Sequence, residues 1–221
     1  MNTNLDYLSD YDRQIMFSYF SLSHSIANLL GEYCEIVIHS LSQFENSVIK
    51  IINGFHTGRK VGSPITDKGL QLLKVYQKDR SVTQQTYFSH LSNGQLIKST
   101  THIIIGTKGN PIGLFCINLN LSYPMDKIIT ALIPPTDMGQ AFKNENFINN
   151  TSDLINETFA NACLEVEKKL SKQSKGYKKA IILHLFENGI FELKEAVAVI
   201  AEKLNLTSHT IYKHLREFKS Q

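Results

Sequence analysis

The chain has 221 residues and a net charge of +3, with 42% hydrophobic and 19% charged residues, an ordinary composition for a globular domain or two. Three singly placed cysteines argue against a disulfide framework, and no stretch approaches the roughly 18 apolar residues of a membrane helix. The N-terminus has neither the basic nor the apolar region of a secretory leader, so we expect a cytoplasmic protein with no membrane partner.

The charge is divided unevenly along the chain. Residues 1–167 contain 12 basic and 15 acidic residues, whereas residues 168–221 contain 11 basic and 5 acidic residues. A mildly acidic body is therefore joined to a basic C-terminal quarter. This asymmetry favours a separate module that binds a polyanion, although a lysine-rich helix is often only a solvated face.

The first predicted element is an amphipathic helix over residues 11–30, where apolar residues recur at three- and four-residue steps. Asp10 is its expected N-cap, and Gly31 is expected to end it. Two short segments rich in β-branched residues then predict strands over 35–40 and 48–53.

A glycine-rich loop over residues 53–62 separates the second strand from a further helical segment. Thr66 or Asp67 is the expected cap of that helix, which extends through Val75.

Three more strands are predicted over residues 82–91, 96–105 and 112–121. Asn93 and Gly94 between the first two predict a type I′ hairpin, in which both central residues need a positive φ. Because every readable connection is tight, the sheet should be mainly antiparallel. The expected fold class is α+β, with a five-stranded antiparallel sheet and helices followed by an all-α module.

Residues 122–150 are rich in proline and asparagine and are expected to form a connector. The helix that follows carries apolar residues at steps of four, three and four, which suits helix pairing or packing within its own domain. These residues are Ile155, Phe159, Ala162 and Val166.

We therefore divide the chain into three parts. Residues 1–122 form the sheet domain, residues 123–176 form a connector with a coupling or dimerisation helix, and residues 177–221 form the basic C-terminal module. The boundary before the last part follows from the basic, serine-containing segment 168–176.

The C-terminal module reads as three helices, over residues 177–188, 193–204 and 209–218. Ala201 is small enough for two helices to cross closely, and Asn205 suits a left-handed turn position. We expect Leu206 to fill the angle between these helices and Ser208 to cap the last one.

This pattern is typical of a helix-turn-helix, whose last helix reads double-stranded DNA. Cationic side chains on that helix would contact phosphates, and small polar ones would reach base edges. The candidate DNA-binding residues are Ser208, His209, Thr210, Tyr212, Lys213, Arg216 and Lys219.

Residues 198–215 resemble the C-terminal helix-turn-helix of YheO-like transcriptional regulators, and the N-terminal part resembles the YheO-like PAS domain of that family. The matching N-terminal segments are CEIVIH (34–39), NG (53–54), TGRKVG (57–62), KSTT (98–101) and PIGLFCINLN (111–120). The resemblance implies a bacterial DNA-binding regulator with a sensor-like PAS domain. It also implies a link to small-metabolite or amino-acid catabolism, since the family includes the regulator of D-arginine utilisation.

Polar residues interrupt or end the apolar strands of the sheet domain. In a PAS-like fold they would converge on a small cavity beside the mid-chain helix and orient a ligand, such as an amino acid or a related metabolite. The candidate ligand-binding residues are His39, Asn53, Arg59, Ser99, Thr100 and Asn118. The alternative is that they satisfy strand ends, with Arg59 paired to a carboxylate such as Asp67.

Enzyme, metal and cofactor sites are not expected. The glycine-rich loop does not have phosphate-loop spacing, and the chain has no Cys-x-x-Cys pair. His209 and His214 lie five residues apart, which is off the spacing of a metal pair on one helix face. Cys34 or Cys116 could in principle form a thiol–imidazole pair with His39, but we expect these cysteines to be small buried hydrophobic residues.

The sequence thus predicts a two-domain transcriptional regulator that binds DNA as a homodimer, with a PAS-like domain that senses a small molecule or mediates dimerisation. The alternatives are a PAS-type adaptor whose helical bundle binds protein and, less favoured, an enzyme fused to a DNA-binding module.

Overall fold

The computed structural model describes residues 5–133 and 148–220. The chain forms two compact units, residues 1–138 and residues 139–221. The C-terminal unit starts at residue 139 and not at the expected residue 177, because the helix that follows residue 150 packs within it. Each unit is described by itself below.

The N-terminal unit is built on the predicted five-stranded sheet, and every strand pair in it is antiparallel. The strands lie in the order β2-β1-β5-β4-β3. Their bounds are β1 Cys34–Ser40, β2 Val48–Ile52, β3 Gln84–His90, β4 Leu96–Ile105 and β5 Pro111–Asn120. The α+β class and the antiparallel pairing predicted from sequence are confirmed.

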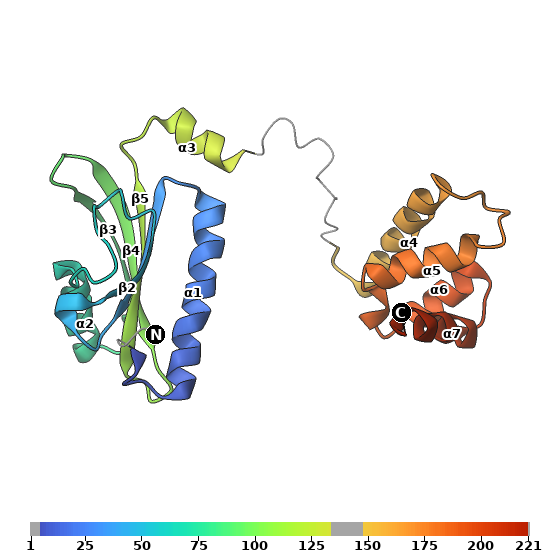
Figure 1. The fold of residues 1–221 in the computed structure, drawn as a ribbon, viewed down its shortest axis with the longest axis horizontal. Helices are drawn as coiled ribbons and strands as arrows, with labels where there is room; N and C mark the ends of the chain where they lie inside the picture. The colour runs from blue at the N-terminus through green and yellow to red at the C-terminus, as the bar shows by residue number, and fades with distance from the viewer. Residues whose placement is uncertain (1–4, 134–147, 221) are drawn as a thin grey trace. The chain divides into compact units, whose positions relative to one another are not determined.

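Helices α1 (Asp10–Leu30) and α2 (Asp67–Lys78) lie on opposite sides of this sheet (Figure 1). Because side chains alternate along a strand, β1 contributes to both apolar layers. Ile36 packs on the α1 side with Met16, and Val37 packs on the α2 side with Leu72. All seven residues of β1 are buried, so whatever this strand carries lies in the interior.

The ends of α1 and α2 follow local capping rules. Ser9, not the predicted Asp10, is the N-cap of α1, and its side chain accepts a hydrogen bond from the Asp12 N–H. Gly31 follows the helix with a φ of 74°, as expected. Thr66 is the N-cap of α2 and accepts from the Gly69 N–H.

The hairpin between β3 and β4 differs from the predicted type I′ turn. Gly94 has a φ of 83°, but Asn93 is not among the residues with positive φ. The Leu91 N–H donates to the Gln95 carbonyl, and the Gly94 N–H donates to the Leu91 carbonyl. Three residues therefore separate the paired positions, and only the glycine takes the left-handed conformation.

A short helix, α3 (Met125–Leu132), occupies the start of the segment expected to be a connector. Pro124 precedes its first turn, where a missing N–H costs nothing, and Ile128 is buried. Proline was therefore a start signal here and not a sign of irregular chain. The rest of the predicted connector, over residues 134–147, lies outside the described residues.

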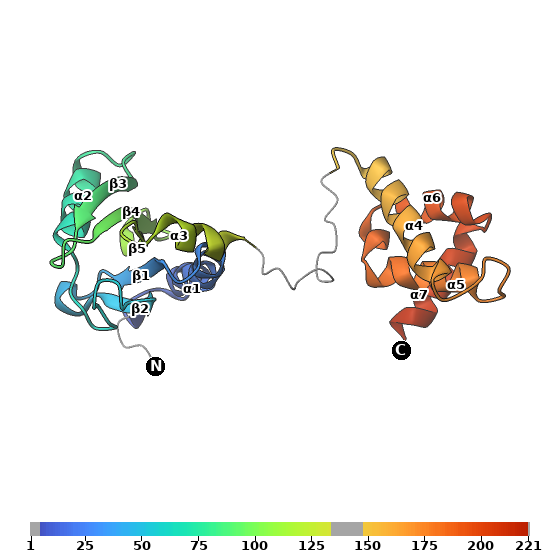
Figure 2. The ribbon, with the colours of Figure 1, turned by 90° about the horizontal axis from the view of Figure 1, so that it is seen from above.

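Over the described residues 148–220, the C-terminal unit contains helices α4 to α7 (Figure 2) and the 3-10 turn η3. Their bounds are α4 Thr151–Glu167, α5 Tyr177–Glu187, η3 Ile190–Glu192, α6 Ala196–Leu204 and α7 Ser208–Lys219. The last three helices correspond to the three expected from sequence, with α6 starting three residues later than predicted because η3 precedes it.

The apolar side of α4 packs into the core of its own unit. Ile155, Ala162 and Val166 are buried in the same cluster as Ile181 of α5 and Ile200 of α6. Of the two roles left open for this helix, the structure therefore favours packing within its own domain.

A cavity-forming substitution should reveal how much α4 contributes. Ile155→Ala is expected to lower the free energy of unfolding of the C-terminal unit by about 2–5 kcal/mol, because Ile155 is fully buried. Leu164→Ala on the exposed side of α4 should change it by less than about 0.5 kcal/mol. Urea denaturation, with amide exchange over residues 177–215 as the local readout, measures both. Equal effects of the two variants would contradict the packing described.

Candidate functional site

The helix-turn-helix geometry centres on the turn between α6 and α7. Asn205 adopts the left-handed conformation, with a φ of 50°, which asparagine tolerates better than most residues. The Leu206 N–H then donates to the Ala201 carbonyl at 2.8 Å, and Ala201 itself is buried. The roles predicted for Ala201 and Asn205 are confirmed.

The start of α7 is capped one residue earlier than predicted. Thr207, not Ser208, is the N-cap, and its Oγ1 accepts from the Thr210 N–H at 3.2 Å. The two threonine hydroxyls lie 2.9 Å apart. Ser208 is therefore free to project from the first turn, whereas the side chain of Thr210 is half-buried and engaged with the cap.

The other six candidate DNA-binding residues are exposed along one face of α7. They are Ser208, His209, Tyr212, Lys213, Arg216 and Lys219. Ile211 and Leu215 on the opposite face are buried in the core, so the helix has a fixed rotational setting. Within the described chain, Lys213, Arg216 and Lys219 make no ion pair with a carboxylate.

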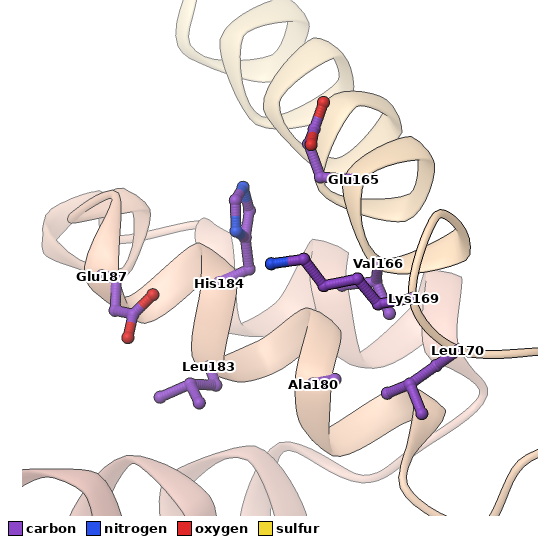
Figure 3. Close-up of a pocket in the computed structure, with 8 residues that line it drawn as sticks. All are labelled: Glu165, Val166, Lys169, Leu170, Ala180, Leu183, His184 and Glu187. Carbon is purple, nitrogen blue, oxygen red and sulfur yellow. The ribbon is translucent and has the colours of Figure 1, made fainter.

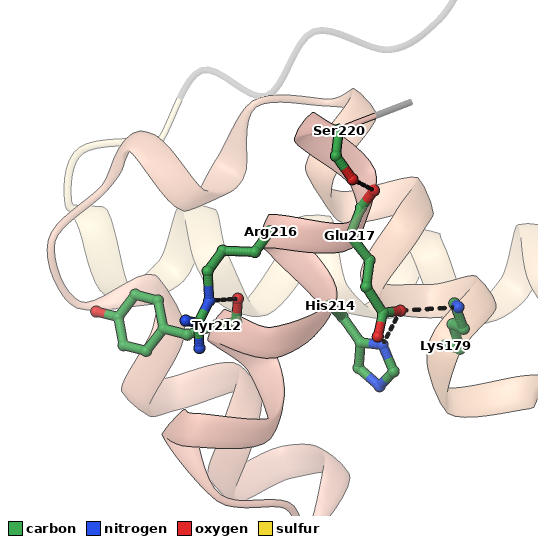
Figure 4. Close-up of polar contacts among 6 residues, drawn as sticks. All are labelled: Lys179, Tyr212, His214, Arg216, Glu217 and Ser220. Atoms are coloured by element: carbon green, nitrogen blue, oxygen red, sulfur yellow. Dashed lines mark hydrogen bonds and ion pairs between the residues drawn. The ribbon is translucent and has the colours of Figure 1, made fainter.

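The acidic residue of α7 lies on its flank and contacts α5. Glu217 accepts from Lys179 at 3.0 Å and pairs with His214 at 3.4 Å (Figure 4). These contacts, that with Lys179 first, hold the pKa of Glu217 below its usual range. The Arg216 Nε donates to the Tyr212 carbonyl at 3.3 Å, so the guanidinium lies beside Tyr212 (Figure 4). The carboxylate is thus occupied by α5, and the exposed face keeps only positive charge.

A groove of about 640 Å³ runs beside this face, between α7 and the η3–α6 segment. Phe191, Leu193 and Val197 form part of its apolar lining, and Lys194 and Lys219 contribute positive charge. A smaller hollow of about 270 Å³ between α4 and α5 is lined by Glu165, Glu187, Lys169 and His184 among others (Figure 3). Mixed charge makes the second hollow a poor match for a polyanion.

In the N-terminal unit, the sheet register brings three of the candidate ligand-binding residues to the α2 side. His39 lies on the same face of β1 as Val37, and Asn118 and Ser99 are cross-strand partners on β5 and β4. His39 Nδ1 lies 2.6 Å from the Ser47 hydroxyl, and both residues are buried.

Two other candidates do not join them. Thr100 alternates to the opposite face of β4, where its hydroxyl pairs with that of Thr86 at 2.8 Å. Asn53 has a φ of 57°, and its amide donates to the carbonyls of Cys34 and Gly31. The sequence shows that both residues are polar. Only the structure shows that Thr100 faces away from the α2 side and that the Asn53 side chain stabilises a turn.

Glu35 is a buried polar residue of this region that sequence reasoning did not single out. Its side chain is fully buried on the α2 side of β1, where Oε1 accepts from Asn118 at 2.8 Å. Oε2 accepts from the hydroxyl of Thr57 at 2.7 Å and from the N–H of Thr57 at 3.3 Å. The available signal was an acidic residue inside an otherwise apolar strand.

Arg59 follows on the same loop as Thr57 and is half-buried. Its guanidinium donates to the Pro64 carbonyl, and it forms no ion pair with Asp67 among the described residues. It lies within electrostatic range of His39 and Cys116, because its charge contributes to the pKa shift of both.

The thiol–imidazole alternative is not supported by this arrangement. Cys34 lies on the α1 side of β1 and His39 on the α2 side. Burial raises the pKa of Cys34 and of Cys116 to about 11, so both thiols stay protonated near neutral pH. Burial also lowers the pKa of His39 to about 3, which leaves it neutral.

Comparison with known proteins adds two family matches. A model of the YheO-like PAS domain matches residues 10–134, and a model described as an HTH domain matches residues 154–216. The second match includes most of α4, in agreement with its packing in the C-terminal unit.

The relatives are bacterial. The protein YheO of Escherichia coli strain K12 is 38% identical over 96% of this chain and 87% of its own length. The transcriptional regulator DauR of Pseudomonas aeruginosa is 28% identical over 91% of this chain and 93% of its own length. A PAS domain of known structure from Colwellia psychrerythraea is 16% identical over 47% of this chain and 98% of that domain, with a TM-score of 0.33. No described helix is long and apolar enough to cross a membrane.

The buried histidine should make the N-terminal unit sensitive to acid. The folded pKa of His39 lies below the value of about 6.5 expected for the unfolded chain, so stability is full above pH 6.5 and falls as the pH decreases towards 3. Between pH 7.5 and pH 5, the free energy of unfolding should fall by about 2 kcal/mol from this group. Urea denaturation followed by circular dichroism at the two pH values measures the change.

A His39→Gln variant should lose most of this dependence, whereas His90→Gln, at an exposed position of β3, should retain it. An unchanged pH dependence in His39→Gln would assign the effect to another group.

Proposed function

The chain belongs to the family of YheO-like PAS domain proteins, and on that basis we propose that it regulates transcription by binding double-stranded DNA through α7. The observation that carries the proposal is the exposed face of α7, whose charged residues are all positive. The opposite face of this helix is packed in the core of a helix-turn-helix. Lys213, Arg216 and Lys219 supply phosphate contacts, and His209 and Tyr212 supply polar contacts to base edges. The transcriptional regulator DauR, which is related over both units, supports the assignment.

We propose that the N-terminal unit is the sensor and that its effector is a small metabolite such as an amino acid. Buried polar side chains on the α2 side of the sheet, within an otherwise apolar interior, support a ligand-binding role. The effector acts by binding two states of the protein with different affinity, and the two states differ in the spacing of two recognition helices. No catalytic step is part of this function, which is exercised in the cytoplasm, where bacterial DNA is accessible.

We further propose a homodimer, since helix-turn-helix proteins commonly read two-fold sites. The outer side of α1 supports it, because residues 14–30 contain no Asp, Glu, Lys or Arg. Leu22 and Leu29 are exposed on this helix, as are Ile129 and Leu132 on α3, which contacts α1. Depletion of charge around exposed apolar side chains is typical of the centre of an interface.

The DNA-binding proposal is tested by charge removal on α7. Lys213→Gln should weaken binding to all duplexes and reduce the salt dependence by about one phosphate contact, since each contact releases counterions. Fluorescence anisotropy with genomic fragments selected by the wild-type chain, titrated with salt, measures both quantities.

Lys169→Gln is the matched control, because it removes the same charge from the hollow between α4 and α5. Equal losses in both variants would indicate general charge attraction instead of a reading face. If the wild-type chain binds no duplex at low salt, the protein-binding adaptor replaces the proposal.

The dimer proposal is tested by placing a charge on α1. Leu22→Glu and Leu29→Glu should convert the chain to a monomer, because an unpaired carboxylate in an apolar interface is strongly disfavoured. Light scattering coupled to size exclusion gives the mass. Thr3→Glu, remote from these side chains in sequence, should leave it unchanged. A wild-type chain that is monomeric at all concentrations tested would refute the proposal.

A further inference from the structure

The groove between α7 and the η3–α6 segment has an apolar interior. Val197 of α6 and Leu215 of α7 line it and are buried, with 7% and 8% exposure. Both belong to the core of the C-terminal unit, so the groove ends on that core. Phe191 and Leu193 also line the groove, and both are only half-buried. Apolar surface that the fold itself does not cover is therefore concentrated in one concave place.

Aromatic side chains form much of this lining. Phe186 of α5 and Phe191 of η3 are half-buried, whereas Tyr212 of α7 is 53% exposed. The Tyr212 ring extends away from His214 and Glu217, which lie on the flank where α7 contacts α5 (Figure 4). Aromatic rings in a groove offer faces and edges against which a further flat ring can pack.

Positive charge borders the apolar lining on two sides. Lys194 lies between η3 and α6, and Arg216 and Lys219 lie on α7. None of these three side chains forms an ion pair within the described chain. Among the described residues that line the groove, Glu192 is the only carboxylate. The groove thus has an excess of unpaired positive charge beside its apolar surface.

The size and the chemistry of the groove together indicate what fills it. Its volume of about 640 Å³ lies within the range of roughly 300–1,000 Å³ that is common for small-molecule sites. A DNA phosphate would neutralise the cations but would leave the aromatic lining in contact with water. An occupant that satisfies both features has a flat apolar body and one anionic group.

We propose that this groove binds a small aromatic carboxylate and that the bound ligand competes with DNA. The rings of the ligand lie against Phe191 and Tyr212, and its carboxylate accepts hydrogen bonds from Arg216 and Lys219. The Arg216 Nε is engaged by the Tyr212 carbonyl, but a guanidinium has further N–H donors. Lys194 adds positive charge from the opposite side of the groove.

Competition follows from the use of the same cations by both partners. Arg216 and Lys219 are also the residues that we assign to phosphate contacts, so a carboxylate bound to them removes those contacts. Ligand binding to the groove does not depend on the proposed function, whereas the competition rests on it. This site acts directly on the reading helix and needs no change in the N-terminal unit.

Ligand binding is tested without DNA, by titrating the full chain with 2-naphthoate. The comparison compounds are 2-naphthamide, which has the same rings without the charge, and acetate, which has the charge without the rings. Calorimetry gives the affinities, and amide chemical shifts in NMR spectra locate the ligand. 2-Naphthoate should bind about fivefold more tightly than 2-naphthamide, because partly exposed ion pairs contribute modestly, and acetate should not bind at the same concentration. The shifts should be concentrated over residues 189–197 and 209–219.

Two variants should separate the charged part of the site from its apolar part. Arg216→Gln should reduce the preference for 2-naphthoate over 2-naphthamide to about twofold, since one cation is lost. Phe191→Ala should weaken both compounds by a similar factor of about five, because their rings are the same. If circular dichroism shows that Phe191→Ala does not fold, Tyr212→Ala, at an exposed position, replaces it.

Two further variants are matched controls and should keep wild-type affinity for 2-naphthoate. Lys178→Gln removes a positive charge from an exposed position of α5 that does not line the groove. Leu183→Ala removes apolar surface from the smaller hollow between α4 and α5. Losses in these controls as large as those in Arg216→Gln or Phe191→Ala would refute the site.

Competition is measured by fluorescence anisotropy with a duplex that the wild-type chain binds. At about ten times its own Kd, 2-naphthoate should raise the apparent Kd for the duplex about tenfold, as expected for mutually exclusive binding. Sodium acetate at the same concentration should leave the duplex affinity unchanged, which separates competition from a general salt effect.

The site is refuted if 2-naphthoate does not bind at millimolar concentration, if 2-naphthamide binds equally well, or if the shifts lie in the N-terminal unit. Binding of a short peptide of Glu, Phe and Leu residues, without binding of 2-naphthoate, would overturn it in favour of a protein partner. Bound 2-naphthoate with unchanged duplex affinity would reject the competition. A chain that binds 2-naphthoate but no duplex would support the site and overturn the DNA-binding proposal, and the competition with it.

Discussion

Burial of β1 on both faces is the constraint on which the N-terminal unit depends. This strand lies between β2 and β5, and α1 and α2 cover its two sides. Alternation sends Ile36 and Ile38 to one apolar layer and Glu35, Val37 and His39 to the other. A strand in this position has no solvent-facing side on which a charged residue could be placed. Glu35 must therefore obtain its partners from the interior, and Asn118 of β5 and Thr57 of the following loop provide them.

In the C-terminal unit, packing likewise decides where the acidic residue of α7 lies. Packing of Ile211 and Leu215 fixes one face of α7, and the Asn205 turn fixes its crossing with α6. Glu217 then binds Lys179 and His214 on the flank. The carboxylate is placed where it joins two helices, on the flank that borders the face with Lys213 and Arg216. A single helix is thus divided into a core face, an anchoring flank and a cationic face.

Prediction from sequence was strongest where a local rule decides the structure. The range predicted for β4, residues 96–105, is the range observed, and the αL preference of Asn205 identified the turn before α7. Prediction failed where two local readings compete. Pro124 was taken as a break although it starts α3, and Asn93–Gly94 was taken as a two-residue turn although a three-residue turn formed. In each case the flanking chain, which a local signal does not describe, selected between the readings.

By itself, the sequence determined the order of the five strands and of helices α1, α2 and α4 to α7. It also determined the antiparallel sheet, the helix-turn-helix and the basic C-terminal surface, because periodicity, caps and charge are properties of neighbouring residues. Only the tertiary structure decided which polar residues share a face. Ser99 and Thr100 are adjacent in the chain and are separated by the sheet, whereas Glu35 and Asn118 are 83 residues apart and hydrogen-bonded. Cross-strand register sets these neighbours, and it depends on how five strands and two helices bury their apolar sides together.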